Sequence, residues 1–378
     1  MKKISLIICA LFINMCFVFG QEKEVNFDSN YIQQNSQQIH IEINEMQELM
    51  YIILALTDNG LQNKNIINHE TSYYEEVIKY FLPYSTHPIV GKLNASLNEN
   101  IVNIILLPGN AYGFQFVGNQ IKPTGVYNFP AKGIGKFEVE KNPILTYLTD
   151  LENFAEKSGF QKFYKEHKGY YNQLKKSYKD YATIGEQKEW LEKRFDYTID
   201  SYRVLTSPLI ASVNATHMFE DNGFKEILLF LPTIKNDSTW TEAYKKAINT
   251  RIIFTEIDHN YVGPISAKNL DQINVSFVNR EKWVDLENKG IPYYPNPLKV
   301  YDEYLTWGLY VLYAYDHFGK DEALFNQVIG GLNEIMVSKR GFIKFKEFSA
   351  YLLQLYKKSE DKKIEKLYPA LLEWGLKQ

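Results

Sequence analysis

Cysteine is nearly missing from this chain of 378 residues, which holds only Cys9 and Cys16. Both lie in an apolar stretch, residues 4–19, that follows the basic start Met1-Lys2-Lys3. A basic start, a short apolar stretch and small residues before a polar one are typical of a secretory signal peptide. We therefore expect residues 1–20 to be a signal peptide, and the rest of the chain to be exported, periplasmic or extracellular, and free of thiols and disulfides.

Two other interpretations of the N-terminal stretch are less favourable. As a membrane anchor, residues 4–19 are short, because a transmembrane helix needs roughly 20 apolar residues. Lipid modification of Cys16 would require small residues before it, and Ile13-Asn14-Met15 does not supply them. We therefore expect no lipoprotein anchor at Cys16.

The chain also lacks a charge excess and a second long apolar run. Its 42 Lys and Arg residues and 45 Asp and Glu residues give a formal net charge of −3, which leaves no electrostatic footprint for nucleic acid. No later apolar run is long enough to span a bilayer, so we expect no integral membrane segment after signal cleavage. A glycine-rich phosphate loop and a Gly-x-Ser-x-Gly elbow are missing too, which excludes sites built on those motifs.

The apolar pattern that remains predicts an α+β fold that is predominantly helical. Residues 21–38 are polar and rich in Asn and Gln, which predicts a flexible N-terminal segment. Residues 39–378 then form a single domain, with a strand-containing first part (39–262) and a helical second part (263–378). Strands are expected at 40–43, 101–107, 111–117, 204–205, 209–213 and 226–231. This small sheet precedes a helix expected over 239–262 and ended by Gly263-Pro264.

The predicted helix 239–262 carries the pentapeptide Thr255-Glu256-Ile257-Asp258-His259. It differs by one residue from His-Glu-x-x-His, the zinc-binding and general-base element of many metallopeptidases. On a helix, residues four apart lie on one face, and in the intact motif the two histidines there bind zinc. Thr255 is a poor ligand in the first of these positions. Glu256 remains as the candidate catalytic base and His259 as a candidate metal ligand.

A catalytic zinc ion needs a third protein ligand, and Glu303 is the best downstream candidate. It lies on a predicted helix with an apolar stripe, and its neighbour Asp302 competes for the role. His217 or Asp258 could compensate for Thr255.

Tyr261 could hydrogen-bond a reaction intermediate. The alternatives remain open: Glu256, Asp258 and His259 could be surface groups or an acid–His pair without metal. His217 could equally be a loop histidine, and Tyr261 a core residue.

Several short segments, in their order along the chain, resemble a group of secreted Bacteroidota proteins catalogued as a domain of unknown function. Many members carry the full His-Glu-x-x-His motif, like a gluzincin metallopeptidase. The resembling segments are Ile43-Asn44 with Leu49, Thr86-His87-Pro88-Ile89-Val90, Phe163-Tyr164 with Tyr170-Tyr171, Ser207-Pro208-Leu209, residues 254–264 and Glu303-Tyr304-Leu305.

This resemblance implies a zincin-like domain, a zinc cofactor and a peptide or protein substrate. It places Glu256 in the general-base position and makes His259 and Glu303 metal ligands. Thr255 departs from the family pattern and puts both zinc affinity and peptidase activity in question. The sequence therefore predicts a metal-dependent peptidase or its degenerate descendant. The alternative is a pseudoenzyme that binds peptide or glycan without cleaving it.

Overall fold

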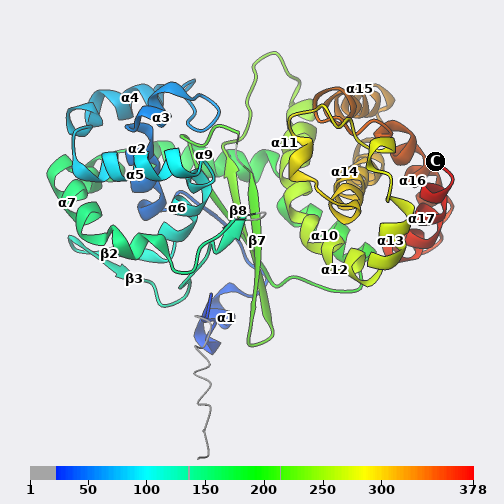
Figure 1. Cartoon of the computed structure of the whole chain (residues 1–378), viewed down its shortest axis with the longest axis horizontal. Coiled ribbons are helices and arrows are strands. Elements are labelled where there is room, and N and C mark those ends of the chain that lie inside the picture. Colours follow the sequence, from blue (N-terminus) through cyan, green and yellow to red (C-terminus); the bar gives the residue numbers. More distant parts are fainter. Residues whose placement is uncertain (1–22, 135–136, 213) are drawn as a thin grey trace, which may run out of the picture.

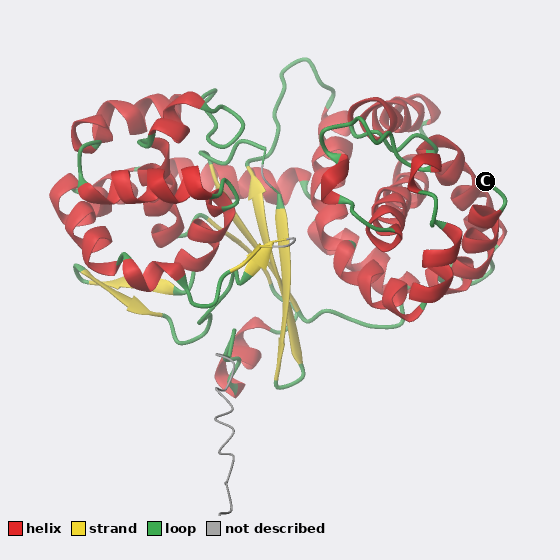
Figure 2. Cartoon of the chain, in the orientation of Figure 1, coloured by secondary structure: helices red, strands yellow, loops and turns green. Residues whose placement is uncertain are grey.

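In the computed structural model, which describes residues 23–134, 137–212 and 214–378, two helical lobes flank a central sheet (Figure 1). Helices dominate and the strands gather mainly in the middle of the molecule, as Figure 2 shows. The predicted α+β, predominantly helical fold is confirmed. The predicted signal peptide with Cys9 and Cys16 lies outside the described residues. Within those residues, no helix combines the length and the apolarity needed to cross a membrane.

The central sheet has four strands in the order β1 (Ile39–Glu42), β6 (Ser201–Ser207), β8 (Phe224–Pro232) and β7 (Ala215–Asp221). The first three run parallel, whereas β7 is antiparallel to β8 and forms an edge of the sheet. Successive side chains of a strand point to opposite faces. Val204, Ile227 and Leu229 therefore belong to the core of the C-terminal lobe, while Leu228 and Phe230 pack into a smaller core on the other face.

The N-terminal lobe is built around α2 (Glu45–Ala55), which is buried along almost its whole length. Asn44 begins this helix as predicted, because its side chain accepts hydrogen bonds from the N–H groups of Met46 and Gln47. The surrounding helices are α3 (Asp58–Gln62), α4 (Ser72–Phe81), α5 (Pro88–Glu99), α6 (Asn103–Ala111), α7 (Leu148–Ser158), α8 (Phe160–Glu166) and α9 (Lys168–Tyr181).

The C-terminal lobe is built around α14 (Pro297–Phe318), a helix of 22 residues buried from Tyr304 to Ala314. It packs against α11 (Glu242–Ile257), α12 (His259–Lys268), α13 (Leu270–Ser276), α15 (Glu322–Asn333) and α16 (Phe345–Lys358). The helices α10 (Ile184–Arg194) and α17 (Tyr368–Leu376) complete this lobe, and a π-helical turn, η5 (Glu334–Lys339), leads from α15 toward α16.

The apolar run 101–107 was expected to be a strand, and this prediction is wrong. The residues form most of α6 (Asn103–Ala111), and Pro108 lies inside that helix. A continuous apolar run fits a buried helix as well as a buried strand, and periodicity alone does not separate them. Here the helix packs against α2, where Gln47 Nε2 donates to the carbonyl of Pro108 at 3.1 Å.

One further strand prediction needs correction, and one strand was missed. Residues 209–212 are not a strand and contribute only an isolated bridge between Ile67 and Ile210, while residue 213 is outside the description. The edge strand β7 was not predicted. It joins β8 through Asn222 and Gly223, both with positive φ (51° and 75°), the backbone that an Asn-Gly hairpin turn requires. That dipeptide was the sequence signal that could have located the hairpin.

The segment 21–38 was expected to be flexible, but from residue 23 onward it is packed against the sheet. It contains α1 (Ser29–Asn35), which Asp28 caps by accepting from the N–H of Tyr31. The Tyr31 hydroxyl donates to buried Glu226 of β8 at 2.6 Å. The polar composition of this segment predicted flexibility, but Asp28 and Tyr31 fix it in place through their hydrogen bonds.

Candidate functional site

The pentapeptide does not lie on one uninterrupted helix. The helix α11 ends at Ile257, Asp258 forms the junction, and α12 begins at His259. Gly263-Pro264 was expected to end the helix, but Pro264 lies within α12. The prediction of one helix over 239–262 is therefore wrong, and Thr255 and His259 come from two successive helices.

Thr255 faces its own helix backbone. It is 4% exposed, and its hydroxyl lies 3.1 Å from the carbonyl of Arg251 and 3.3 Å from that of Ile252, to which it donates. A threonine that bonds back to the preceding turn has satisfied its hydroxyl locally. Thr255 is therefore a packed helical residue without the geometry of a metal ligand.

His259 and Glu303, which the sequence paired across 44 positions, do meet in the structure. The Nε2 atom of His259 lies 3.9 Å from Oε2 of Glu303 on α14, and its Nδ1 atom lies 3.3 Å from the hydroxyl of Thr306. Burial lowers the pKa of His259, although the Glu303 carboxylate acts in the opposite direction. The imidazole is therefore neutral at physiological pH.

The second partner of Glu303 is a residue that sequence reasoning missed. Arg340 follows the π-helical turn and donates from its guanidinium to Oε1 of Glu303, which also accepts from Nε1 of Trp307 at 2.8 Å. The same guanidinium donates to the hydroxyl of Tyr294. Glu303 is only 5% exposed, so Arg340 supplies the compensating charge that a buried carboxylate requires. Nothing in the local sequence marks Arg340 for this role.

Glu256 lies at the same cluster. Burial raises the pKa of its carboxyl to about 7, and the charge of Glu303 acts in the same direction. The charge of Arg340 and a hydrogen bond with Asn214, just before β7, oppose this shift. The structure thus brings together Glu256, His259 and Glu303.

Asp258 is completely buried behind the cluster. Neither oxygen of its carboxyl group has a hydrogen-bond partner among the residues that the structure describes. Burial, followed by the charges of Glu256 and Glu303, raises its pKa well above the usual range. Burial therefore favours the protonated form of Asp258, which sits at the junction between α11 and α12. The competing candidate Asp302 interacts with Ser266 instead.

Two other candidate residues lie away from the cluster. His217 pairs with Leu228 in the sheet and shares its face, whereas the adjacent Thr216 faces α12 and accepts from Asn260 Nδ2 at 3.0 Å. Because side chains alternate along a strand, His217 points to the opposite face and cannot replace a ligand at position 255. Tyr261 has no exposed surface, and its hydroxyl bonds that of Tyr202 in β6. We correct both assignments: neither side chain faces the cluster.

The donors at this cluster fit a catalytic zinc centre poorly. Such a centre needs three protein ligands, and the described residues contain no group of three His, Cys, Asp or Glu side chains placed to hold a metal ion. Arg340 also puts a positive charge on the carboxylate that would bind the metal. Zinc binding therefore stays a prediction, supported only by the facing atoms of His259 and Glu303.

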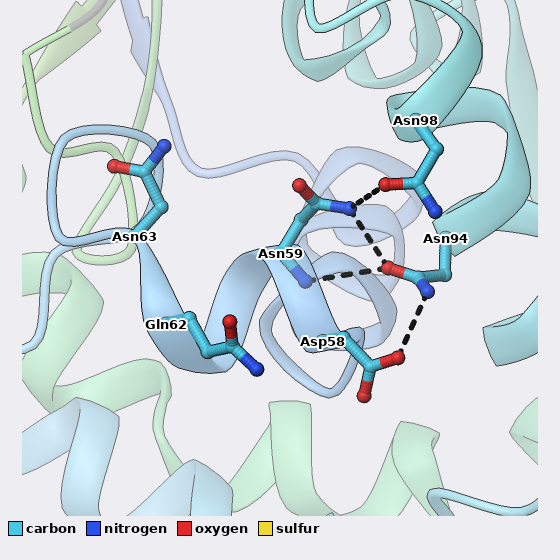
Figure 3. A pocket seen from close by; sticks show the side chains of 6 residues that line it. All are labelled: Asp58, Asn59, Gln62, Asn63, Asn94 and Asn98. Atoms are coloured by element: carbon cyan, nitrogen blue, oxygen red, sulfur yellow. Dashed lines mark hydrogen bonds between the residues drawn. The ribbon is translucent and has the colours of Figure 1, made fainter.

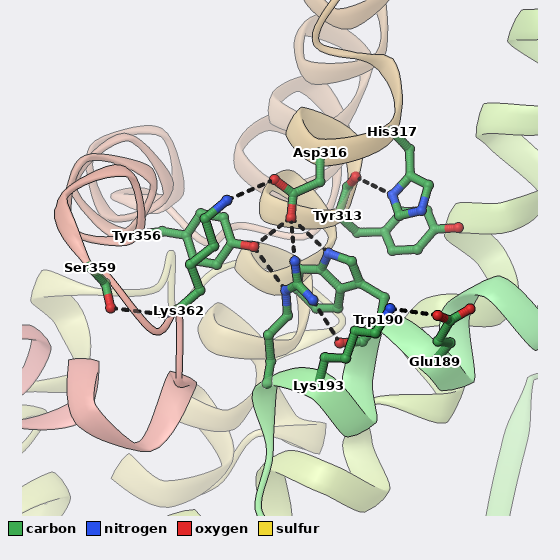
Figure 4. A network of polar contacts seen from close by, with 10 residues as sticks. Glu189, Trp190, Lys193, Tyr313, Asp316, His317, Tyr356, Ser359 and Lys362 are labelled. Carbon is green, nitrogen blue, oxygen red and sulfur yellow. Dashed lines mark hydrogen bonds and ion pairs between the residues drawn. The ribbon is translucent and has the colours of Figure 1, made fainter.

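Other polar clusters satisfy their members more fully. In a pocket of about 330 Å³ beside α3 and α5, the Nδ2 atom of Asn59 donates to the side-chain oxygens of Asn94 and Asn98 (Figure 3). In the C-terminal lobe, one Asp316 oxygen accepts from Trp190 (Figure 4) and also from Arg194. These clusters hold elements together. The cluster at Glu303 differs because fully buried Asp258 lies beside it without a partner.

Comparison of the chain with protein-family models, with curated proteins and with solved structures finds no match.

Proposed function

We propose that the chain is an exported, zincin-like binding protein that holds an extended peptide beside Glu256, His259 and Glu303 without cleaving it. The observation that carries this proposal is the ion pair between Arg340 and Glu303. A cation already fixed on the candidate ligand competes with a metal ion for the same carboxylate. Together with the inward-bonded Thr255, it favours a binding role over metal-assisted hydrolysis.

The edge strand β7 supports a peptide as the ligand. It pairs with β8 on one side, and no other described strand pairs with it. Its start lies at the cluster, because Asn214 reaches Glu256 and Thr216 reaches Asn260. An extended peptide can add to such an edge through main-chain hydrogen bonds, and neighbouring side chains then select its sequence. A glycan would not use this edge in the same way.

Peptide binding can be tested with two proline variants of β7, Thr216→Pro and His217→Pro. Neighbouring N–H groups of a strand point to opposite sides, so one of the two faces the free edge. Purified protein is incubated with a pool of unstructured peptides, and retention and cleavage are followed by mass spectrometry. We expect the wild-type protein to retain peptides without cleaving them. The proline variant whose lost N–H group faces the free edge should keep wild-type thermal stability and should no longer retain peptides.

The controls are Thr216→Ala and His217→Ala, which keep the N–H groups and should retain peptides. A protein that retains no peptide would refute the proposal. Retention that survives both proline substitutions would remove β7 from it.

The second candidate function is a zinc peptidase, favoured by the 3.9 Å separation of His259 Nε2 and Glu303 Oε2. Zinc binding by calorimetry separates the two. We expect no stoichiometric zinc in the wild type or in Thr255→His. The double variant Thr255→His with Arg340→Ala should gain zinc binding, because it adds a ligand and frees the carboxylate. Stoichiometric zinc together with peptide cleavage by the wild type would establish the peptidase instead.

A further inference from the structure

Arg251 is a partly buried cation without an anion. It lies on α11 four residues before Thr255, and therefore on the same face of that helix. Its Nε atom is buried without an acceptor, and no hydrogen bond or ion pair joins the guanidinium of Arg251 to any residue that the structure describes. Its guanidinium carbon lies 5.1 Å from the centre of the indole ring of Trp307. A guanidinium held in this way presents donors that only a ligand or water can satisfy.

Two more cations lie near Arg251. The guanidinium carbon of Arg340 is 4.9 Å from the centre of the Trp307 ring. Lys235 lies in the loop that leads from β8 to α11. Burial lowers the pKa of Lys235, and the charge of nearby Arg251 lowers it further. Among the described residues, only Arg340 of these three pairs with a carboxylate, that of Glu303. Arg251 therefore stands beside two further cations, of which only Arg340 is paired, in a protein whose overall charge is slightly negative.

We infer that Arg251, assisted by Lys235 and Arg340, binds the C-terminal carboxylate of the peptide ligand. A guanidinium and a carboxylate can form two parallel hydrogen bonds, a strong arrangement where water is partly excluded. This inference rests on the proposed peptide-binding function and adds that the ligand ends inside the site. It predicts selection for a free chain end rather than for an internal segment.

The separation of Arg251 and Glu256 along α11 indicates how many peptide residues lie between the C-terminal carboxylate and Glu256. Arg251 and Glu256 are five residues apart, which is roughly 7.5 Å along a helix axis at 1.5 Å per residue. An extended peptide covers that length with about two residues at roughly 3.3 Å each. Arg340 connects the two ends of this span, because its guanidinium carbon lies 4.9 Å from the centre of the Trp307 ring and it also donates to Glu303, which faces His259. A carboxylate on Arg251 would thus leave the peptide bonds just before the C-terminus near Glu303 and His259.

The test compares two N-acetylated random hexapeptide pools that differ only at the C-terminus, one a free acid and one an amide. Equilibrium dialysis against the purified protein measures the affinity of each pool. We expect the free-acid pool to bind about tenfold more tightly or better, which corresponds to about 1.4 kcal/mol or more. Arg251→Gln should remove this preference. Arg251→Lys should keep part of it, because lysine retains the charge but not the planar fork.

Arg280→Gln is the matched control. Arg280 is also partly buried and its Nε atom also lacks an acceptor, but it lies in η3 (Arg280–Lys282) and not on α11, and Arg251 and Arg340 are the described arginines that stack on Trp307. This substitution should leave the free-acid preference unchanged. Thermal melts of each variant show whether a lost preference reflects lost folding.

The outcomes are distinguishable. Equal affinity of the acid and amide pools overturns the carboxylate assignment and leaves peptide binding intact. Failure of both pools to bind overturns the proposed function and this inference together. Inorganic phosphate that binds through Arg251 more tightly than the free-acid pool assigns the cluster to a phosphate group and also overturns it. If Arg251→Gln still binds the free-acid pool more tightly than the amide pool, the assignment of Arg251 to the carboxylate is overturned as well.

Discussion

Two arginine–glutamate pairs, each with a buried carboxylate, lie in different parts of this molecule, and their surroundings differ. Arg203 and Glu226, on neighbouring strands of the sheet, sit in a network that combines hydroxyl groups, an amide and the carboxylate of Glu42. Glu226 accepts from the hydroxyls of Tyr31, Tyr127 and Ser201. Arg203 donates to Glu42 and to Asn35, so this network ties α1 and three strands together.

The pair formed by Arg340 and Glu303 is less complete. Glu303 is satisfied, but Arg251 has no partner among the described residues, and neither do the carboxyl oxygens of Asp258. Unpaired buried polar groups cost stability, and native proteins contain few of them. The two pairs differ in degree. Arg203 donates from both of its terminal nitrogens and lacks a partner only at Nε, whereas no side-chain hydrogen bond or ion pair to a described residue satisfies Arg251 or Asp258.

The sharpest test of this contrast is to remove each arginine. Arg203→Ala would leave Glu226, which has no exposed surface, without its counter-charge, and should destabilise the protein by about 3–5 kcal/mol. The side chain of Arg340 is 31% exposed, so water can reach the site and Arg340→Ala should cost less, about 1–2 kcal/mol. Urea denaturation measures both values. Equal losses would break the comparison.

A smaller effect is expected from the pH dependence of stability. The folded pKa of Glu256, about 7, exceeds the usual value for an unfolded chain, near 4.5. Its contribution to stability is therefore complete below about pH 4.5 and is lost as the pH rises toward 7. Because the side chain is partly exposed, we expect a loss of about 1–2 kcal/mol over this range, absent in Glu256→Gln.

Urea denaturation at pH 5 and pH 8 provides the measurement for Glu256. Glu226→Gln is the companion variant and should lower stability at both pH values, because it disturbs a satisfied network. A wild-type protein equally stable at both pH values would contradict the assignment of Glu256 to a buried cluster.

The smallest effect is expected at Tyr261. Tyr261→Phe removes one buried hydrogen bond with Tyr202 and should cost about 1 kcal/mol of stability. Peptide affinity should not change, because the hydroxyl points into the core between α12 and the sheet. Thermal melts and equilibrium dialysis measure the two quantities. Weaker peptide binding by a fully folded variant would return Tyr261 to the site.

The sequence predicted the site where its residues were close in sequence or shared a recognisable spacing. Glu256 and His259 came from the motif and Glu303 from an expected later helix, and the three meet. Arg340 and Arg251 were missed. Arginine is common both at the ends and in the middle of helices, so its position in the sequence does not reveal a role. The role depends on the residues that lie near the side chain in space.

The helices and strands also fall into those that local sequence signals located and those that they did not. Local signals located α2, β8 and most of the C-terminal helices, because a cap or an apolar period acts within a few residues. They failed for residues 101–107, where the surrounding lobe selected helix over strand, and for α1, which long-range bonds to Glu226 hold in place.

The helix-rich α+β class and the candidate residues Glu256, His259 and Glu303 follow from the sequence. The interruption of the helix at Asp258, the bond of Thr255 to its own backbone and the contact of Arg340 with the Glu303 carboxylate became visible in the folded chain alone. The physical reason is distance along the chain. Periodicity and capping act between near neighbours, whereas the charge and burial of a side chain depend on residues that folding brings to it.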